Sequence, residues 1–116
     1  MNLIALGINH NSANVDVRER VAFAPEQVSE AMNDACRQTG IDEVVVLSTC
    51  NRTEIYAVAP RHHALSDKAR ELIDWMAGYH HLSADELATA AYHHEGEDAL
   101  RHMVHVAAGL DSMVLG

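Results

Sequence analysis

The chain has 116 residues, 48% of them hydrophobic, with 8 Lys and Arg against 17 Asp and Glu for a formal net charge of -9. This length and apolar content suffice for one domain with its own core, without disulfides or a structural metal. Because the balance is acidic, the chain as a whole repels polyphosphates, so its composition argues against nucleic acid as a partner.

The sequence shows no sign of a membrane or secreted protein. No apolar stretch approaches the roughly 20 residues of a membrane-spanning helix, and the N-terminus lacks the basic flank of a signal peptide. We therefore expect a cytoplasmic protein without a membrane partner. The two cysteines, Cys36 and Cys50, have no metal-type spacing and are expected to remain reduced there.

The N-terminal third predicts one strand followed by helices. Residues 3–8 are apolar and end in turn-forming residues, which indicates a strand and a loop. A short helix is predicted over residues 15–21. From 25 to 39 apolar residues recur at helical spacing, with Pro25 suited to the first turn and Gly40 to the C-terminal cap.

One strand is predicted on each side of Cys50. Residues 43–47 are apolar and mostly β-branched, a pattern typical of a buried strand. Residues 53–59 alternate between two faces, as a second strand would. Cys50 is therefore expected in the turn between them.

The second half of the chain predicts three helices and a last short strand. An amphipathic pattern covers 65–79, and the capping box of Ser83 and Glu86 opens a brief helix through residue 91. A strand is predicted at 92–94 and a helix at 97–108. The order β-α-β-β-α-β predicts an α+β sandwich, a small antiparallel sheet with helices packed on one face.

Cys50 and Arg52 offer the clearest candidate chemistry. A guanidinium near a thiol lowers its pKa, and the thiolate is the reactive form. Arginine also holds carboxylates through two parallel hydrogen bonds, so one loop can supply both attack and substrate recognition. The competing interpretation is a small cysteine packed beneath a turn, with the arginine solvating the surface.

The nine histidines do not form a metal-binding pattern. Only His102 and His105 share a helix face, and no third ligand is spaced to complete a site, so no metal is expected. A histidine near Cys50 could act as general acid or base, although spacing does not show which one. The chain has no Gly-x-Gly-x-x-Gly motif, so none of its residues is expected to bind a dinucleotide by the usual route.

Three groups of residues together closely resemble the N-terminal catalytic domain of glutamyl-tRNA reductases, in the family's order and spacing. They are Gly7-Ile8-Asn9-His10 with Arg18-Glu19-Arg20, Ser48-Thr49-Cys50-Asn51-Arg52-Thr53-Glu54, and Gly109-Leu110-Asp111-Ser112-Met113-Val114-Leu115-Gly116. The resemblance implies that residues 1–116 form one N-terminal catalytic, substrate-binding domain. It also implies that an NADPH-binding domain and the dimerisation helix of a homodimer lie outside this chain.

The activity implied by the resemblance is an NADPH-dependent reduction of glutamyl-tRNA(Glu) to glutamate-1-semialdehyde. This is the first step of the C5 pathway to 5-aminolevulinate and tetrapyrroles, including porphyrins. Cys50 would attack the glutamyl ester and form a thioester. A thioester accepts hydride more readily than an oxygen ester, so covalent capture divides one difficult reduction into two easier steps.

The resemblance also implies roles for individual residues. Substrate binding falls to Thr49, Cys50, Asn51, Arg52 and Ser112. Cys50 and His102 are the implied catalytic pair, with the histidine transferring a proton or positioning a neighbour. Residues 11–14 read Asn-Ser-Ala-Asn where the family usually has Lys-Thr-Ala-Pro, which weakens a substrate role for this loop.

Two other functions stay open at this point. One is a cysteine hydrolase that uses a Cys50/His102 dyad. The other is a non-catalytic interaction module in which Cys50 is structural. Inert thiol chemistry would favour the module, and a response to a hydride donor would favour the reductase over the hydrolase.

Overall fold

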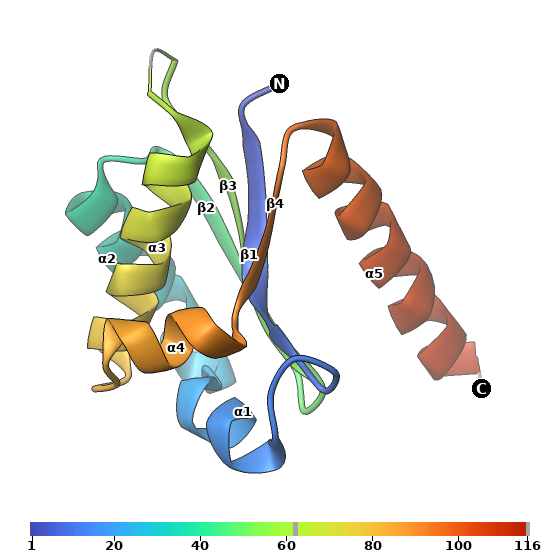
Figure 1. Ribbon diagram of the computed structural model, residues 1–116. Helices are drawn as coiled ribbons and strands as arrows, with labels where there is room; N and C mark the ends of the chain where they lie inside the picture. Colours follow the sequence, from blue (N-terminus) through green and yellow to red (C-terminus); the bar gives the residue numbers. More distant parts are fainter. Residues whose placement is uncertain (62, 116) are drawn as a thin grey trace.

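Four antiparallel strands form one sheet in the computed structural model, which describes residues 1–61 and 63–115, with side chains as far as Gly109 (Figure 1). The strands are β1 (Leu3–Asn9), β2 (Glu43–Ser48), β3 (Arg52–Val58) and β4 (Tyr92–Glu95). Their order is β2-β3-β1-β4, so β1 and β3 are central and β2 and β4 are edges. The expected α+β class with an antiparallel sheet is confirmed.

Helices cover both faces of this sheet. The helices are α1 (Val15–Val21), the 3-10 helix η1 (Pro25–Gln27), α2 (Val28–Thr39), α3 (Leu65–Tyr79), α4 (Ala84–Ala90) and α5 (Glu97–Leu115). Figure 1 shows α1 to α4 on one side, while α5 runs along the other and contacts β1 and β4. The expected one-sided packing therefore holds for every helix except α5.

The pairing register sorts the strand residues between the two faces. Because directly opposite residues of an antiparallel pair point to the same face, Leu6 of β1 and its partner Ile55 of β3 enter the core beneath α2 and α3. Gly7 lies opposite Glu54 on one side and Tyr92 on the other, and these three residues face α5. The two faces therefore differ in chemistry: one is apolar and the other carries buried polar groups.

Most element boundaries agree with the sequence predictions, and the agreement is best at the caps. Gly40 ends α2 in a left-handed conformation with φ of 72°, and Ser83 accepts a hydrogen bond from the Glu86 N–H at 3.0 Å. The helix predicted from residue 25 begins as the separate turn η1. The helix predicted to end at 108 continues to Leu115.

The strand predicted at 43–47 forms as β2, but it is only half buried. Only alternate residues of β2 are buried, and Val45 is 55% exposed. The reason is that β2 is an edge strand, and Val45 lies on the face opposite to the core that Val44 and Val46 enter. Among the described residues, no helix is long and apolar enough to cross a membrane.

Gly7 allows the two central strands to approach each other. Its φ is +154°, and a Cβ at this position would lie 2.1 Å from the carbonyl oxygen of Thr53 and 2.8 Å from the Cα of Glu54. No side chain fits there without moving β3. The close approach of β1 and β3 therefore depends on glycine.

We predict that Gly7→Ala lowers the free energy of unfolding by roughly 2 kcal/mol or more, because overpacking and a strained φ each cost about 1–3 kcal/mol. Gly78→Ala is the matched control. A Cβ at this position in α3 meets nothing within 4 Å, so alanine there should stabilise the protein by about 0.5–1 kcal/mol. Urea unfolding measures the change in the free energy of unfolding for each variant. Equal changes in the two variants would contradict the role of Gly7.

Candidate active site

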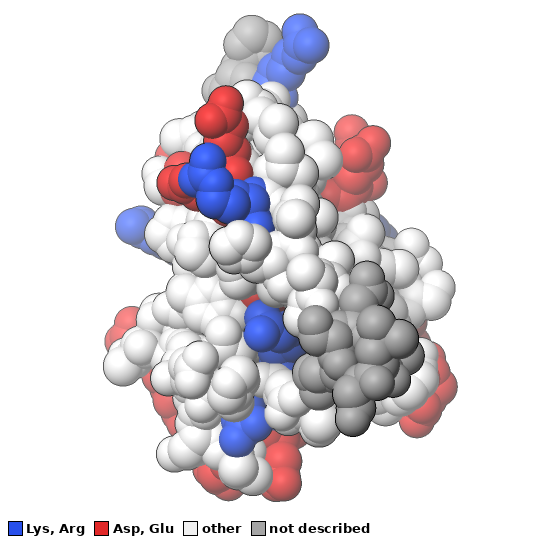
Figure 2. Space-filling model, turned by 90° about the vertical axis from the view of Figure 1, so that its right-hand side faces the viewer, with Lys and Arg blue, Asp and Glu red and all other residues white. Residues whose placement is uncertain are grey.

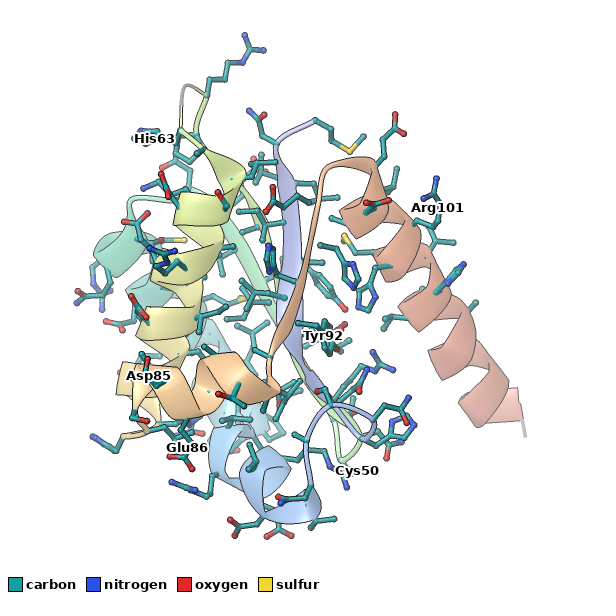
Figure 3. The ribbon with its side chains drawn as sticks, in the orientation of Figure 1. Cys50, His63, Asp85, Glu86, Tyr92 and Arg101 are labelled. Atoms are coloured by element: carbon teal, nitrogen blue, oxygen red, sulfur yellow. The ribbon has the colours of Figure 1, made fainter. Side chains whose placement is uncertain are left out.

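Cys50 lies exposed at the tip of the loop between β2 and β3, as expected (Figure 3). Thr49 closes this loop: its N–H donates to the Arg52 carbonyl at 2.7 Å, and its hydroxyl accepts from the N–H groups of Asn51 at 3.2 Å and Arg52 at 3.3 Å. These local bonds fix the turn without using the thiol. Cys50 is therefore presented to solvent by a well-defined backbone.

Behind the loop, the side chain of Glu54 is fully buried between the sheet and α5. Its carboxylate accepts hydrogen bonds from the Tyr56 and Tyr92 hydroxyls and from His102 Nε2, the last at 2.5 Å. Arg52 Nη1 lies 3.4 Å away. Figure 3 shows Tyr92 in the space between the sheet and α5. Donors from β3, β4 and α5 thus converge on one carboxylate.

These contacts decide the charge of the cluster. Burial by itself raises the pKa of Glu54, but hydrogen bonds from Tyr56, Tyr92 and His102 outweigh it and hold the pKa below its ordinary value. Burial, followed by the hydrogen bond to Glu54, raises the pKa of both tyrosines. The cluster therefore contains an ionised carboxylate held by neutral phenols, a histidine and an arginine.

The sequence builds this cluster through strand register. Glu54, Gly7 and Tyr92 form a row across three strands, and Gly7 leaves the space that the Glu54 side chain occupies, since the Glu54 Cγ lies 3.0 Å from where a Cβ would be. His102 reaches the row from α5. Its ring stacks on His94 with centroids 4.5 Å apart, and burial lowers the pKa of His94.

Three of the predicted substrate-binding residues line one cavity of about 290 Å³ between the β2–β3 loop and α5. The cavity is lined by Thr49, Asn51 and Arg52 from the loop, by His10, and by His105, Val106 and Gly109 from α5. We refer to it as the Arg52 cavity. The structure therefore brings together the loop residues that the sequence pattern grouped.

The other predicted site residues lie elsewhere. Cys50 lines a neighbouring cavity on the α1 side of the loop, which it shares with Thr49. His102 lines a third cavity with Tyr92 and His94, and its Nε2 is committed to Glu54. The side chain of Ser112 lies outside the described residues. Among the hydrogen bonds of the described residues, none joins Cys50 to His102, the dyad that the hydrolase alternative requires.

The main participants that sequence reasoning missed are Glu54, Tyr56 and Tyr92. A signal was present, because Arg52, Glu54 and Tyr56 occupy alternate positions and so share one face of β3. An alternating pattern does not by itself show what covers the polar face of a strand. In the structure α5 covers this face, and no local pattern specifies that placement.

Comparison with known proteins decides the family. The family described as "Glutamyl-tRNAGlu reductase, N-terminal domain" matches residues 6–116. The chain belongs to this family. The resemblance drawn from the three sequence motifs is thereby confirmed.

Glutamyl-tRNA reductases of known sequence match this chain over its whole length. Glutamyl-tRNA reductases from Shewanella amazonensis and Pseudomonas fluorescens are 50% and 54% identical over 116 residues, all of this chain but 26% of their own length. The glutamyl-tRNA reductase structure from Methanopyrus kandleri has a TM-score of 0.68 at 32% identity, covering 97% of this chain and 23% of that one. The chain therefore spans about a quarter of its relatives' length.

No group of three or more His, Cys, Asp or Glu side chains among the described residues is placed to hold a metal ion. The sequence has no glycine-rich turn from a strand into a helix, the feature by which a dinucleotide is usually bound. We assign none of its residues to NADPH.

We predict that Glu54→Gln removes a stabilisation that depends on pH. Because folding lowers the pKa of Glu54 from 4.5, its contribution is complete above that value and is lost as the pH falls through the folded-state pKa. The difference in the free energy of unfolding between wild type and Glu54→Gln should be constant near neutral pH and shrink below about pH 4.5.

Urea unfolding from pH 7 to 3 measures this difference. The matched control is Glu43→Gln, because Glu43 is exposed on the edge strand β2. The difference in the free energy of unfolding between wild type and Glu43→Gln should stay near zero at every pH. A Glu54 difference that does not change with pH would contradict the ionised, donor-bound carboxylate.

Proposed function

We propose that this chain performs the acyl-transfer step of a glutamyl-tRNA reductase, with Cys50 as the nucleophile. The observation that supports this proposal best is the position of Cys50, exposed between Thr49 and Asn51, both of which line the Arg52 cavity. A nucleophile is thus adjacent to a cavity that contains a guanidinium. An ester that also carries a carboxylate is the substrate class this arrangement suits.

The chemical step is a transesterification. The Cys50 sulfur attacks the ester carbonyl carbon of glutamyl-tRNA, a C–S bond forms, and the bond from that carbon to the tRNA 3′ oxygen breaks. The thiol proton ends on the released 3′ hydroxyl. The products are a glutamyl thioester on Cys50 and free tRNA, and no electron is gained or lost.

Arg52 is the proposed binding group for the substrate carboxylate. Its side chain is 19% exposed and is held at one end by Glu54 at 3.4 Å. A guanidinium has five N–H donors, so an arginine fixed by one buried carboxylate still presents donors to a second. Glu54 therefore orients Arg52 without exhausting its hydrogen-bonding capacity.

His102 is a positioning residue in this proposal. Its Nε2 proton is donated to Glu54, 2.5 Å away, and Glu54 in turn holds Arg52. Loss of the imidazole would remove one donor from a buried carboxylate and loosen its hold on the arginine. This arrangement favours the positioning role over direct proton transfer at Cys50.

Reduction of the thioester to glutamate-1-semialdehyde, with hydride from NADPH, is proposed for the longer protein. We also propose that the longer protein is a homodimer, is cytoplasmic and acts in 5-aminolevulinate synthesis. NADPH supplies a hydride when it is bound. No residue of this chain is assigned to the dinucleotide, and no step of the mechanism above depends on it.

We predict that incubation with glutamyl-tRNA gives a glutamyl adduct on Cys50, detected by mass spectrometry of the intact chain. Cys50→Ser should give no glutamyl adduct at this position, because a serine hydroxyl is a far weaker nucleophile than a thiolate. Cys36→Ser is the matched control. This partly buried cysteine of α2 lies outside the loop and should leave the adduct unchanged.

The outcomes separate the candidate functions. No adduct on a folded wild-type chain would contradict the acyl-transfer proposal and favour the interaction module. Glutamate released continuously, without an accumulating adduct, would instead indicate a hydrolase.

We predict that Arg52→Lys slows acylation by glutamyl-tRNA about 10- to 100-fold, because one bidentate, charge-assisted contact is worth about 1.5–3 kcal/mol. Lysine keeps the positive charge next to Glu54. The control substrate is glutaminyl-tRNA, whose side chain is a neutral amide. Wild-type chain should prefer the glutamyl ester, and Arg52→Lys should lose most of that preference. A preference that survives in Arg52→Lys would contradict the assignment.

A further inference from the structure

The β2–β3 loop separates two cavities, and only one of them is used by the function proposed above. The second has a volume of about 260 Å³ and is lined by Val15, Arg18, Glu19 and Ala22 of the α1 segment together with Thr49 and Cys50. We refer to it as the α1 cavity. Thr49 lines both cavities, so Cys50 lies at the boundary between them.

Arg18 is the basic residue of the α1 cavity, and its hydrogen-bonding capacity is largely unused. Its Nη1 donates to the Cys50 carbonyl oxygen at 3.3 Å, and its Nε is buried without a hydrogen-bond partner. No carboxylate among the described residues forms an ion pair with it. By contrast, Arg20 binds Glu86 at 2.8 Å and Arg52 binds Glu54.

The surroundings of Arg18 suit an anion. A guanidinium with free donors matches the geometry of a phosphate, which it can bind through two parallel hydrogen bonds. Glu19 is the acidic lining residue of the cavity, and its side chain is exposed. Figure 2 shows two groups of basic atoms in the lower half of the α5-bearing face, with acidic atoms below the lower group.

The geometry of ester attack connects the two cavities. An ester carbonyl carries its acyl chain on one side and its alcohol oxygen on the other. With the glutamyl chain in the Arg52 cavity and Cys50 at the carbonyl carbon, the alcohol portion extends away from that cavity. The α1 cavity lies on that other side of the loop, where Cys50 itself forms part of the wall.

The size of the α1 cavity limits what it can hold. Its volume of about 260 Å³ is slightly below the roughly 300–1,000 Å³ of common small-molecule sites. One nucleoside fits this scale, and a base-paired stem does not.

We propose that the α1 cavity binds the leaving group, the 3′-terminal nucleoside of the tRNA, and that Arg18 binds the phosphate on its 5′ side. This inference rests on the function proposed above, because it requires Cys50 to attack a glutamyl ester. Arg18 holds both the backbone of the nucleophile and the phosphate of the departing alcohol.

Two small esters test this proposal on the 116-residue chain. One is 3′-O-glutamyl adenosine, and the other is the same ester with a 5′-phosphate. The rate of glutamyl transfer to Cys50 is measured by mass spectrometry for each. The wild-type chain should react faster with the phosphorylated ester by about tenfold, because one charge-assisted contact is added. Raising the salt concentration should reduce this preference.

The informative quantity is the ratio of the two rates in each variant. Arg18→Gln should bring the ratio close to one, even if loss of the bond to the Cys50 carbonyl slows both reactions. Arg18→Lys should retain part of the ratio. The matched control is Arg70→Gln, an exposed arginine of α3 that lines neither cavity, and it should keep the wild-type ratio.

The possible failures are distinguishable. Equal rates for the two esters in wild type, or a ratio that Arg18→Gln leaves intact, would overturn the phosphate site while acylation of Cys50 still supports the proposed function. No acylation by either ester or by glutamyl-tRNA would overturn both. Far-UV circular dichroism and thermal unfolding of each variant establish that a lost ratio does not come from a lost fold.

Discussion

The arrangement of this site depends on burying one carboxylate. An ionised group without partners inside a protein is very costly, so Glu54 is tolerable only while several donors surround it. Those donors come from different elements: Tyr56 from the same strand, Tyr92 from the edge strand β4, and His102 from α5. The carboxylate therefore fixes α5 against the sheet, and α5 supplies one wall of the Arg52 cavity.

Local parts of the fold were predictable from the sequence. The left-handed Gly40 and the N-cap Ser83 act within a few residues, so their signals identify helix ends directly. The exposure of Val45 was not predictable, because it depends on which strand becomes an edge. The placement of α5 on the second face is likewise a tertiary result, since its apolar pattern does not specify which surface it covers.

In the candidate site, too, contacts between residues near in the sequence were predictable and contacts between distant residues were not. Thr49 to Arg52 are contiguous, so their grouping at one loop followed from the strands on either side. The partner of His102 is 48 residues away, and spacing along the chain carries no information about such a contact. Glu54 belongs to a motif that the sequence analysis identified, but its burial and its hydrogen bonds depend on α5, which covers it in the folded structure.

The contacts of Glu54 also have a thermodynamic consequence. Arg52 and His102 share one acceptor, so the position of α5 and the occupancy of the Arg52 cavity are coupled equilibria. A ligand that draws the guanidinium away from Glu54 leaves the carboxylate with the imidazole and the two phenols as its donors, and so changes the free energy that holds α5 in place. Linkage is reciprocal: a force that moves α5 must change the affinity for that ligand by the same factor.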